Sequence, residues 1–288
     1  MTSTVTAAVV GGTAGVITSL GSVWLKGVVD ARFARKKHDL DYEYAERRKL
    51  REAIGRHHGR VLDAADSWNG RMRNLYDHEG KGWLSVGSNY GADNHYFEST
   101  VCRFLTLMAR VRLFERDALF IDGRFADTSD LAFLRYMRAL RMFMTDARVS
   151  EDVPGGQEFS ARDHFFADQL RRLADAIIDG DDVVPAAELF ERMKAGKLDP
   201  VCAFFDGLRR DEDRVRWDRI VAHHLVVMAF VNSFGDEVQR RDDYGRVIQE
   251  LRHVRTAANV AALVSNLRLE RDASANDLVA TLQSRRVS

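Results

Sequence analysis

The chain has 288 residues, and its 43 Lys and Arg residues balance its 43 Asp and Glu residues. This balance excludes the strongly basic footprint of a general nucleic-acid-binding domain, so we expect no nucleic-acid partner. The only cysteines, Cys102 and Cys202, lie in apolar contexts. They exclude a disulfide framework and predict packed, reduced thiols.

The first predicted element is an uncharged stretch of 22 residues, Thr4 to Leu25. As a helix it would extend roughly 33 Å, which is enough to cross the hydrocarbon of a bilayer. We therefore predict that residues 1–26 form a single transmembrane anchor. A signal peptide and a glycine-rich helix buried in the protein are the alternatives, although no Lys or Arg precedes the stretch and no convincing cleavage site follows it.

The anchor is poor in large apolar residues, but its small residues share one helical face. Ala7, Gly11, Gly15 and Ser19 follow one another at four-residue intervals. A ridge of this kind lets two helix backbones approach closely within a membrane. The pattern predicts a homo-oligomer that associates through these four residues.

Basic residues follow the anchor, and none precedes it. Between Lys26 and Arg51 there are nine Lys or Arg residues against five Asp or Glu residues. Because positive charge stays on the cytoplasmic side, we predict an external N-terminus and a cytoplasmic C-terminal domain. The basic residues nearest the anchor are expected to contact anionic lipid headgroups. They are Lys26, Arg32, Arg35, Lys36 and Lys37.

We predict an all-α chain in which residues 27–60 form a basic amphipathic stalk helix that leads into a helical bundle domain, residues 61–270. Apolar residues at helical spacing form a packing seam. Its members are Leu50, Ile54, Val61, Ala65, Trp68, Met72 and Leu75. An earlier and weaker seam runs through Phe33, Leu40 and Tyr44. Self-association through the stalk as well as the anchor is therefore expected.

The remaining elements are also predicted to be helical. Residues 77–94 are glycine-rich and predict a connecting loop, and residues 271–288 predict a polar C-terminal tail. The most apolar segment of the body, residues 220–234, is too short and too polar to span a membrane and predicts the central core helix. The other expected helices cover residues 95–120, 131–144, 161–178, 186–195, 200–210 and 243–269.

No residue set predicts a metal site or a catalytic centre. Glu250 and His253 form one E-x-x-H pair, whereas a di-iron bundle needs two such pairs. Asp163, His164 and Asp168 would place a histidine and a carboxylate on one helix face, but no nucleophile accompanies them, and a helix-capping role is favoured. We expect no metal, no cofactor and no enzymatic activity.

Arginines on two successive predicted helices form the last candidate. They are Arg103, Arg110, Arg112, Arg116, Arg135, Arg138 and Arg141. Salt bridges between the helices are the simpler interpretation. If acidic partners are missing, Arg103, Arg110, Arg135 and Arg138 would form an anion-binding site together with His164, because guanidinium groups bind phosphate in a bidentate manner.

The combined pattern predicts a membrane-tethered, self-associating scaffold that is not an enzyme and binds an unknown protein partner. Two alternatives stay open. The Thr and Ser residues of the anchor suggest an oligomerising, membrane-perturbing effector such as a toxin or a defence protein. The arginine-rich helix pair suggests an anion or nucleotide sensor.

Overall fold

The structure is a computed structural model that describes residues 2–91, 93–119, 121–155, 163–241 and 243–284, with side chains for residues 32–33 and from 35 onward. Its helices are α1 (Thr2–His78), α2 (His95–Ala118), α3 (Thr128–Thr145), α4 (Ala167–Asp175), α5 (Ala186–Lys194), α6 (Asp199–Phe205), α7 (Arg216–Phe234), α8 (Tyr244–Gln249), α9 (Val254–Asn266) and α10 (Ala273–Ser284). Four 3-10 turns lie between them, η1 (Glu79–Lys81), η2 (Gly123–Phe125), η3 (Ala147–Ser150) and η4 (Leu269–Arg271). Two short antiparallel strands, β1 (Ile178–Asp179) and β2 (Asp182–Val183), complete the elements. The prediction of an all-α fold is confirmed.

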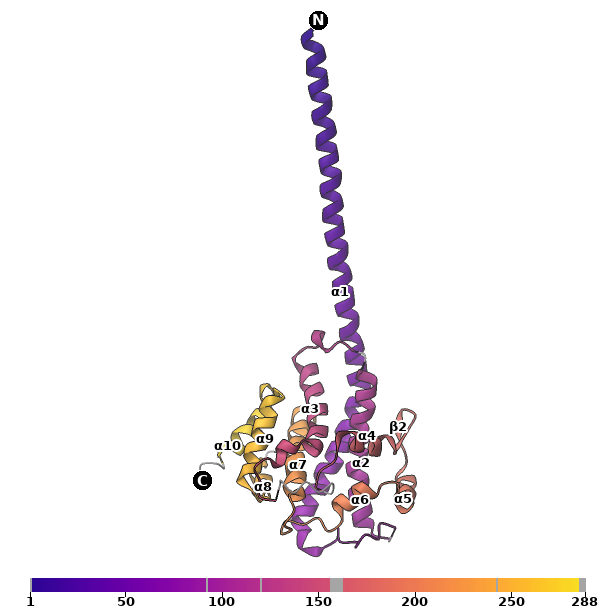
Figure 1. Cartoon of the computed structure of the whole chain (residues 1–288), viewed down its shortest axis with the longest axis vertical. Coiled ribbons are helices and arrows are strands. Elements are labelled where there is room, and N and C mark those ends of the chain that lie inside the picture. The colour runs from indigo at the N-terminus through magenta and orange to yellow at the C-terminus, as the bar shows by residue number, and fades with distance from the viewer. Residues whose placement is uncertain (1, 92, 120, 156–162, 242, 285–288) are drawn as a thin grey trace.

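The first helix, α1, organises the molecule. Figure 1 shows it crossing the body at one end and projecting far beyond it at the other. The predicted seam becomes buried from Leu50 onward, and only Ile54 among its members is half-buried. This part of α1 packs against α2 and α7. We call residues 32–45, which precede the buried part, the projecting segment.

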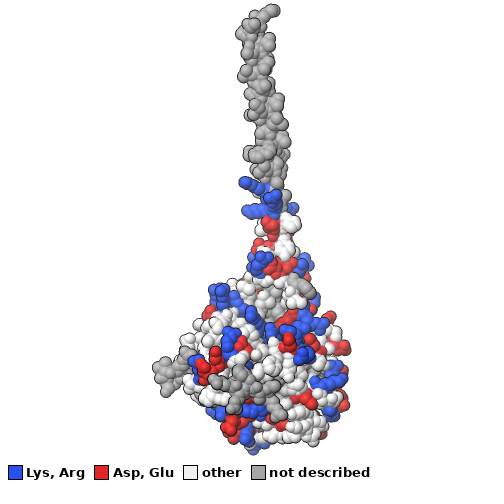
Figure 2. All heavy atoms as spheres, viewed as in Figure 1, with Lys and Arg blue, Asp and Glu red and all other residues white. Residues whose placement is uncertain are grey.

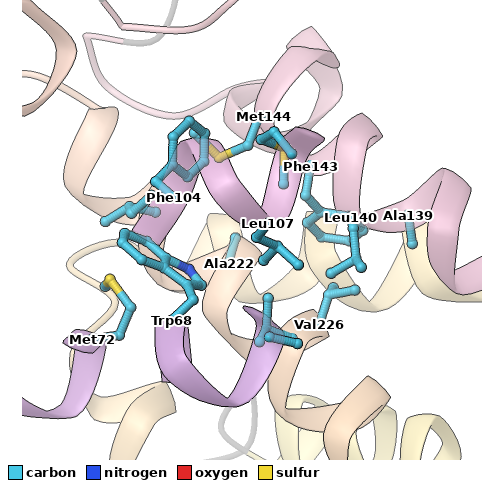
Figure 3. Close-up of a cluster of buried hydrophobic side chains, with 14 of the residues drawn as sticks. Trp68, Met72, Phe104, Leu107, Ala139, Leu140, Phe143, Met144, Ala222 and Val226 are labelled. Carbon is cyan, nitrogen blue, oxygen red and sulfur yellow. The ribbon is translucent and has the colours of Figure 1, made fainter. Parts of the chain in front are cut away.

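The core is built where α1, α2, α3 and α7 meet. Figure 3 shows Trp68, Phe104, Leu140 and Val226, one residue from each helix, interdigitated in one cluster. Helix α7 is buried from Arg216 to Asn232, so the prediction of a central core helix there is confirmed.

A buried histidine of α7 is satisfied by polar groups of α1. His224 lies 2.8 Å from Asn69 Oδ1 through Nε2 and 2.9 Å from the Tyr76 hydroxyl through Nδ1. Its Nε2–H therefore donates to the amide oxygen while Nδ1 accepts the phenol proton, which fixes the neutral tautomer. Burial lowers the pKa of His224 well below its ordinary value, in keeping with this neutral form. The pair of contacts locks the register of α1 against α7.

The predicted loop at residues 77–94 is largely irregular, as expected, and is held from a distance. The carboxylate of Asp206, just after α6, accepts three successive backbone N–H groups, from Val86, Gly87 and Ser88, at 2.7 to 3.2 Å. A carboxylate in such a concave set of N–H groups balances their partial charges. The loop therefore has a structural tether to the bundle.

Four expected elements differ from the structure. The expected helix at residues 200–210 is α6, which ends at Phe205. Residues 161–178 were expected to be helical throughout, but α4 begins only at Ala167, with Phe166 extended before it. The expected helix at residues 243–269 is divided into α8 and α9. The expected polar tail, residues 271–288, contains α10, which buries Ala275, Leu278 and Leu282 against the body. Their spacing by three and four residues gives α10 an apolar face, and burial of that face stabilises the helix.

Where the structure describes side chains, no helix is both long enough and apolar enough to cross a membrane. The side chains of the predicted anchor, Thr4–Leu25, lie outside that part of the chain. The same holds for the ridge residues Ala7, Gly11, Gly15 and Ser19, and for Lys26. The anchor and its small-residue ridge therefore stay predictions.

Candidate functional site

Most of the arginines singled out in the sequence have partners of their own. Arg112 Nε donates to Asp175 Oδ1 at 2.9 Å, and Arg141 Nε donates to Glu115 Oε1 at the same distance. Arg110 pairs with Asp182 on strand β2. These contacts join α2 to α3, α4 and the hairpin, so the simpler interpretation of inter-helical salt bridges is confirmed for Arg112 and Arg141, whereas Arg110 pairs with a strand.

Other arginines cap the carboxyl ends of helices, a use that the sequence did not reveal. Arg219 is fully buried, and its Nη1 donates to the carbonyl oxygens of Phe143 (3.1 Å) and Asp146 (2.9 Å), where α3 ends. Arg216 donates to the Phe204 carbonyl at 2.6 Å, where α6 ends, and its Nε donates to both carboxylate oxygens of Glu212. The last carbonyls of a helix lack intrahelical partners and carry partial negative charge, so a buried guanidinium satisfies both needs.

The proposed anion set does not assemble. Arg103 donates to the Ser67 carbonyl, and Arg135 donates to the Arg268 carbonyl at the other side of α3. His164 is buried, and burial followed by the charge of Arg219 lowers its pKa. Arg138 is exposed and lines a pocket with Arg112, Arg141 and Arg171. With Arg110 bound to β2, the five side chains of the predicted site lie beside different neighbours.

The histidine and carboxylate arrangement at residues 163–168 is also wrong. Asp163 and His164 precede α4, so they do not share a helix face with Asp168. Asp163 is buried and pairs with Arg214, whereas Asp168 is exposed and pairs with Arg171 at 2.8 Å. The separation removes the geometry that a general base would need.

The histidine of the E-x-x-H pair lies at the junction between α7 and α9. This residue, His253, approaches Asp218 Oδ2 through Nδ1 at 2.9 Å, and Asp218 also accepts the backbone N–H groups of Arg252 and His253 and the hydroxyl of Thr256. The buried Asp218 of α7 thereby holds the two residues that lead into α9 and the Thr256 side chain in its first turn. Within the described ranges no three His, Cys, Asp or Glu side chains are grouped as a metal would require.

The thiols are inert in this fold. Cys102 and Cys202 are buried, and burial raises the pKa of each to about 12. A protonated, buried thiol is a poor nucleophile and a poor metal ligand. The expectation of packed, reduced cysteines agrees with this placement.

The projecting segment carries the most exposed functional candidates. Phe33, Leu40 and Tyr44 are 68%, 56% and 74% exposed, and at 100° per residue they lie within about 40° of one another on the helix. We call these three residues the uncovered stripe. A helical face of this kind, uncovered within the described part of the chain, is unusual because large apolar side chains are normally buried.

Basic residues surround the N-terminal end of the projecting segment. Figure 2 shows them as a blue cluster directly next to the atoms that are not described. Arg32, Arg35, Lys36 and Lys37 are all exposed. Their charges are exposed to solvent.

No protein-family model, curated protein or solved structure matches the chain.

Proposed function

We propose that the protein is a membrane-tethered, self-associating scaffold that is not an enzyme, with residues 1–26 as its anchor and the bundle as the part that binds another protein. The observation that carries this proposal is the uncovered stripe on a helix that continues without interruption into the core. Two copies that pack stripe against stripe would remove these side chains from water, which stabilises association.

The charge pattern beside the stripe supports a parallel pair. Placing Phe33 and Leu40 at position d of a heptad puts Lys37 and Tyr44 at position a, and the long stem of Lys37 lets its ammonium group leave the seam for water. Position g of one helix then faces position e of the next heptad in the partner. These contacts are Lys36 with Asp41 of the second copy and Glu43 with Arg48 of the second copy, and both are attractive. A shared membrane anchor would also hold two copies parallel.

The basic cluster supports the orientation. Arg32, Arg35, Lys36 and Lys37 follow the uncharged stretch within one or two helical turns of each other. Positive residues beside a span keep their side in the cytoplasm and attract anionic headgroups. The bundle is thus proposed to be cytoplasmic and the N-terminus external.

Association is tested by sedimentation equilibrium of the full chain in detergent. The double variant Leu40→Lys with Tyr44→Lys is expected to lower the dimer fraction, because it places four like charges in the seam. Ala45→Lys is the matched control, since Ala45 is exposed outside the uncovered stripe. Equal dimer fractions in the double variant and the control would contradict the proposal.

The register has its own test. Lys36→Glu is expected to weaken the pair because it faces Asp41 of the second copy, and adding Asp41→Lys is expected to restore it. A charge swap that restores association identifies a parallel contact between these positions. The charge swap could fail to restore association while the Leu40 and Tyr44 double variant still lowers the dimer fraction. That result would support self-association through the uncovered stripe and reject this register.

The anchor is tested separately. A reporter fused after Ser288 is expected to be protected from protease added to intact cells, and deletion of residues 1–26 is expected to release the chain from the membrane fraction. Cleavage of the reporter would contradict the orientation. Release of dye from vesicles by the full chain would favour the membrane-perturbing effector over the scaffold.

A further inference from the structure

A cavity of about 310 Å³ lies away from the sites described above, between the start of α3, the end of α7 and the connection from α9 to α10. The residues of its lining that matter here are Thr128, Ser129, Arg135, Arg268, Arg271 and Asp272. Its volume is at the lower end of the range for small-molecule sites. The cavity joins segments that are more than a hundred residues apart in the sequence.

The three arginines of this cavity lack the carboxylate partners that three other arginines of α2 and α3 have. Arg110, Arg112 and Arg141 each have a carboxylate partner. Across the described ranges, Arg135, Arg268 and Arg271 make no ion pair; the one contact among them is the 3.1 Å hydrogen bond from Arg135 Nη1 to the Arg268 carbonyl. Their remaining N–H donors are available to a ligand.

Arg268 lies just after α9, where that helix ends. Its φ is 56°, in the left-handed region that glycine or asparagine normally occupies after a helix. Its N–H donates to the Ser265 carbonyl at 2.8 Å, while its own carbonyl accepts from Arg135. These two contacts hold the Arg268 backbone at the edge of the cavity.

The carboxylates around the cavity are already bound. Asp272 Oδ1 accepts the hydroxyls of Tyr136 (2.8 Å) and Ser233 (2.6 Å) and the N–H of Ala275 (3.2 Å), which caps α10. Burial, followed by the charge of Asp272, raises the pKa of Tyr136, so its hydroxyl stays a donor.

At the start of α3, the other two acids share a cation. Asp127 and Asp130 both pair with Arg51. Three guanidinium groups against the single carboxylate of Asp272 leave the cavity with a net charge of about +2, next to the positive end of the α3 dipole.

We propose that this cavity binds a small phosphate-bearing anion, held by the guanidinium groups of Arg268 and Arg271 with the hydroxyls of Thr128 and Ser129 beside them. Planar guanidinium groups match phosphate oxygens in a bidentate manner, and hydroxyls near a helix N-terminus add donors. This site does not depend on the anchor or on self-association, so the bundle would combine a scaffold with a ligand-controlled surface.

Calorimetric titration of the full chain in detergent with pyrophosphate, at ionic strength held constant with sodium chloride, tests the site. Arg268→Asn together with Arg271→Gln is expected to weaken binding at least about tenfold, the factor that corresponds to the loss of one charge-assisted hydrogen bond. Asparagine tolerates the left-handed backbone, so the melting temperature is expected not to fall. Arg138→Gln is the control, because Arg138 is an exposed arginine of α3 that lines a different pocket, and the affinity of this variant is expected to be unchanged.

Ser129→Glu provides a second and independent variant. Glu at the second position of α3 favours the helix, but it places a carboxylate in the cavity and is expected to abolish binding. No saturable binding by the unaltered chain would overturn the proposal. It would also be overturned if Arg138→Gln weakened binding as much as the Arg268 and Arg271 variant did.

Discussion

Replacing Asp218 by asparagine is expected to destabilise the bundle by about 3 kcal/mol. Its Oδ2 accepts the backbone N–H of His253 (3.1 Å), the His253 ring (2.9 Å) and the Thr256 hydroxyl (2.8 Å), and its Oδ1 accepts the backbone N–H of Arg252 (2.7 Å). An amide can keep its oxygen in the place of Oδ2. Its NH₂ group must then face the Arg252 N–H, donor against donor.

The magnitude follows from these four contacts. A buried N–H without an acceptor costs about 1–3 kcal/mol, and each of the three remaining bonds weakens by about 1 kcal/mol when its acceptor loses the charge. The smaller desolvation cost of a neutral amide offsets part of this sum and leaves about 3 kcal/mol. For a chain of this size the melting temperature should fall by about 6–12 °C.

Thermal unfolding followed by far-ultraviolet circular dichroism measures the effect on the full chain in mild detergent. Asp211→Asn is the control, because Asp211 is an exposed residue whose ion pair with Arg209 should contribute less than about 0.5 kcal/mol. Hydrogen exchange should also become faster at the amides of Arg252 and His253, which donate to Asp218 just before α9. A melting temperature for Asp218→Asn that equals the control would refute this account of the junction between α7 and α9.

Three further predictions concern buried groups. Burial lowers the pKa of His223 to about 3, below its unfolded value of about 6.5. The stability that depends on the neutral ring is therefore complete above about pH 6.5 and is lost as the pH falls toward 3. Between pH 7 and pH 5, urea unfolding should show that His223→Leu gains about 2 kcal/mol of unfolding free energy relative to the unaltered chain. An unchanged difference between the two pH values would show that this histidine does not titrate on unfolding. Arg219→Met should lower the unfolding free energy by about 2–4 kcal/mol, since it removes the donor from two carbonyls at the end of α3. Loss of the exposed Arg148 should change the unfolding free energy by less than about 1 kcal/mol. Equal values for the two variants would reject the capping role of Arg219. Cys102 and Cys202 should react with a thiol reagent only in denaturant, and rapid labelling of the native chain would contradict their burial.

The parts of the fold that follow from local patterns could be predicted from the sequence. The core position of α7 follows from its unbroken apolar run, and the buried part of α1 follows from the spacing of residues such as Trp68 and Met72. The helix α10 also had such a signal, since Ala275 and Leu278 are three residues apart on its buried face. The polar residues between them concealed it.

Features that depend on distant partners could not be predicted. The break before α9 depends on Asp218, which lies more than thirty residues earlier in the chain. The cavity beside α3 unites Arg135 with Arg268, which are separated by 133 residues, and one sequence carries no information about that proximity. The sequence also could not show which arginines form ion pairs and which cap helix carbonyls. The same side chain does both, and its role depends on the groups that the fold brings near it.

The continuity of α1 has a mechanical consequence. Between Arg32 and Ile54 the helix contains no glycine or proline, so it offers no joint between the projecting segment and the core. Torque applied to the projecting segment would act directly on Trp68 and its neighbours. In the proposed pair, the seven residues from Tyr44 to Leu50 set the direction in which each body leaves the common axis, because each residue turns the helix by about 100°. Inserting one residue there would swing both bodies by that angle, whereas inserting seven would nearly restore their original directions.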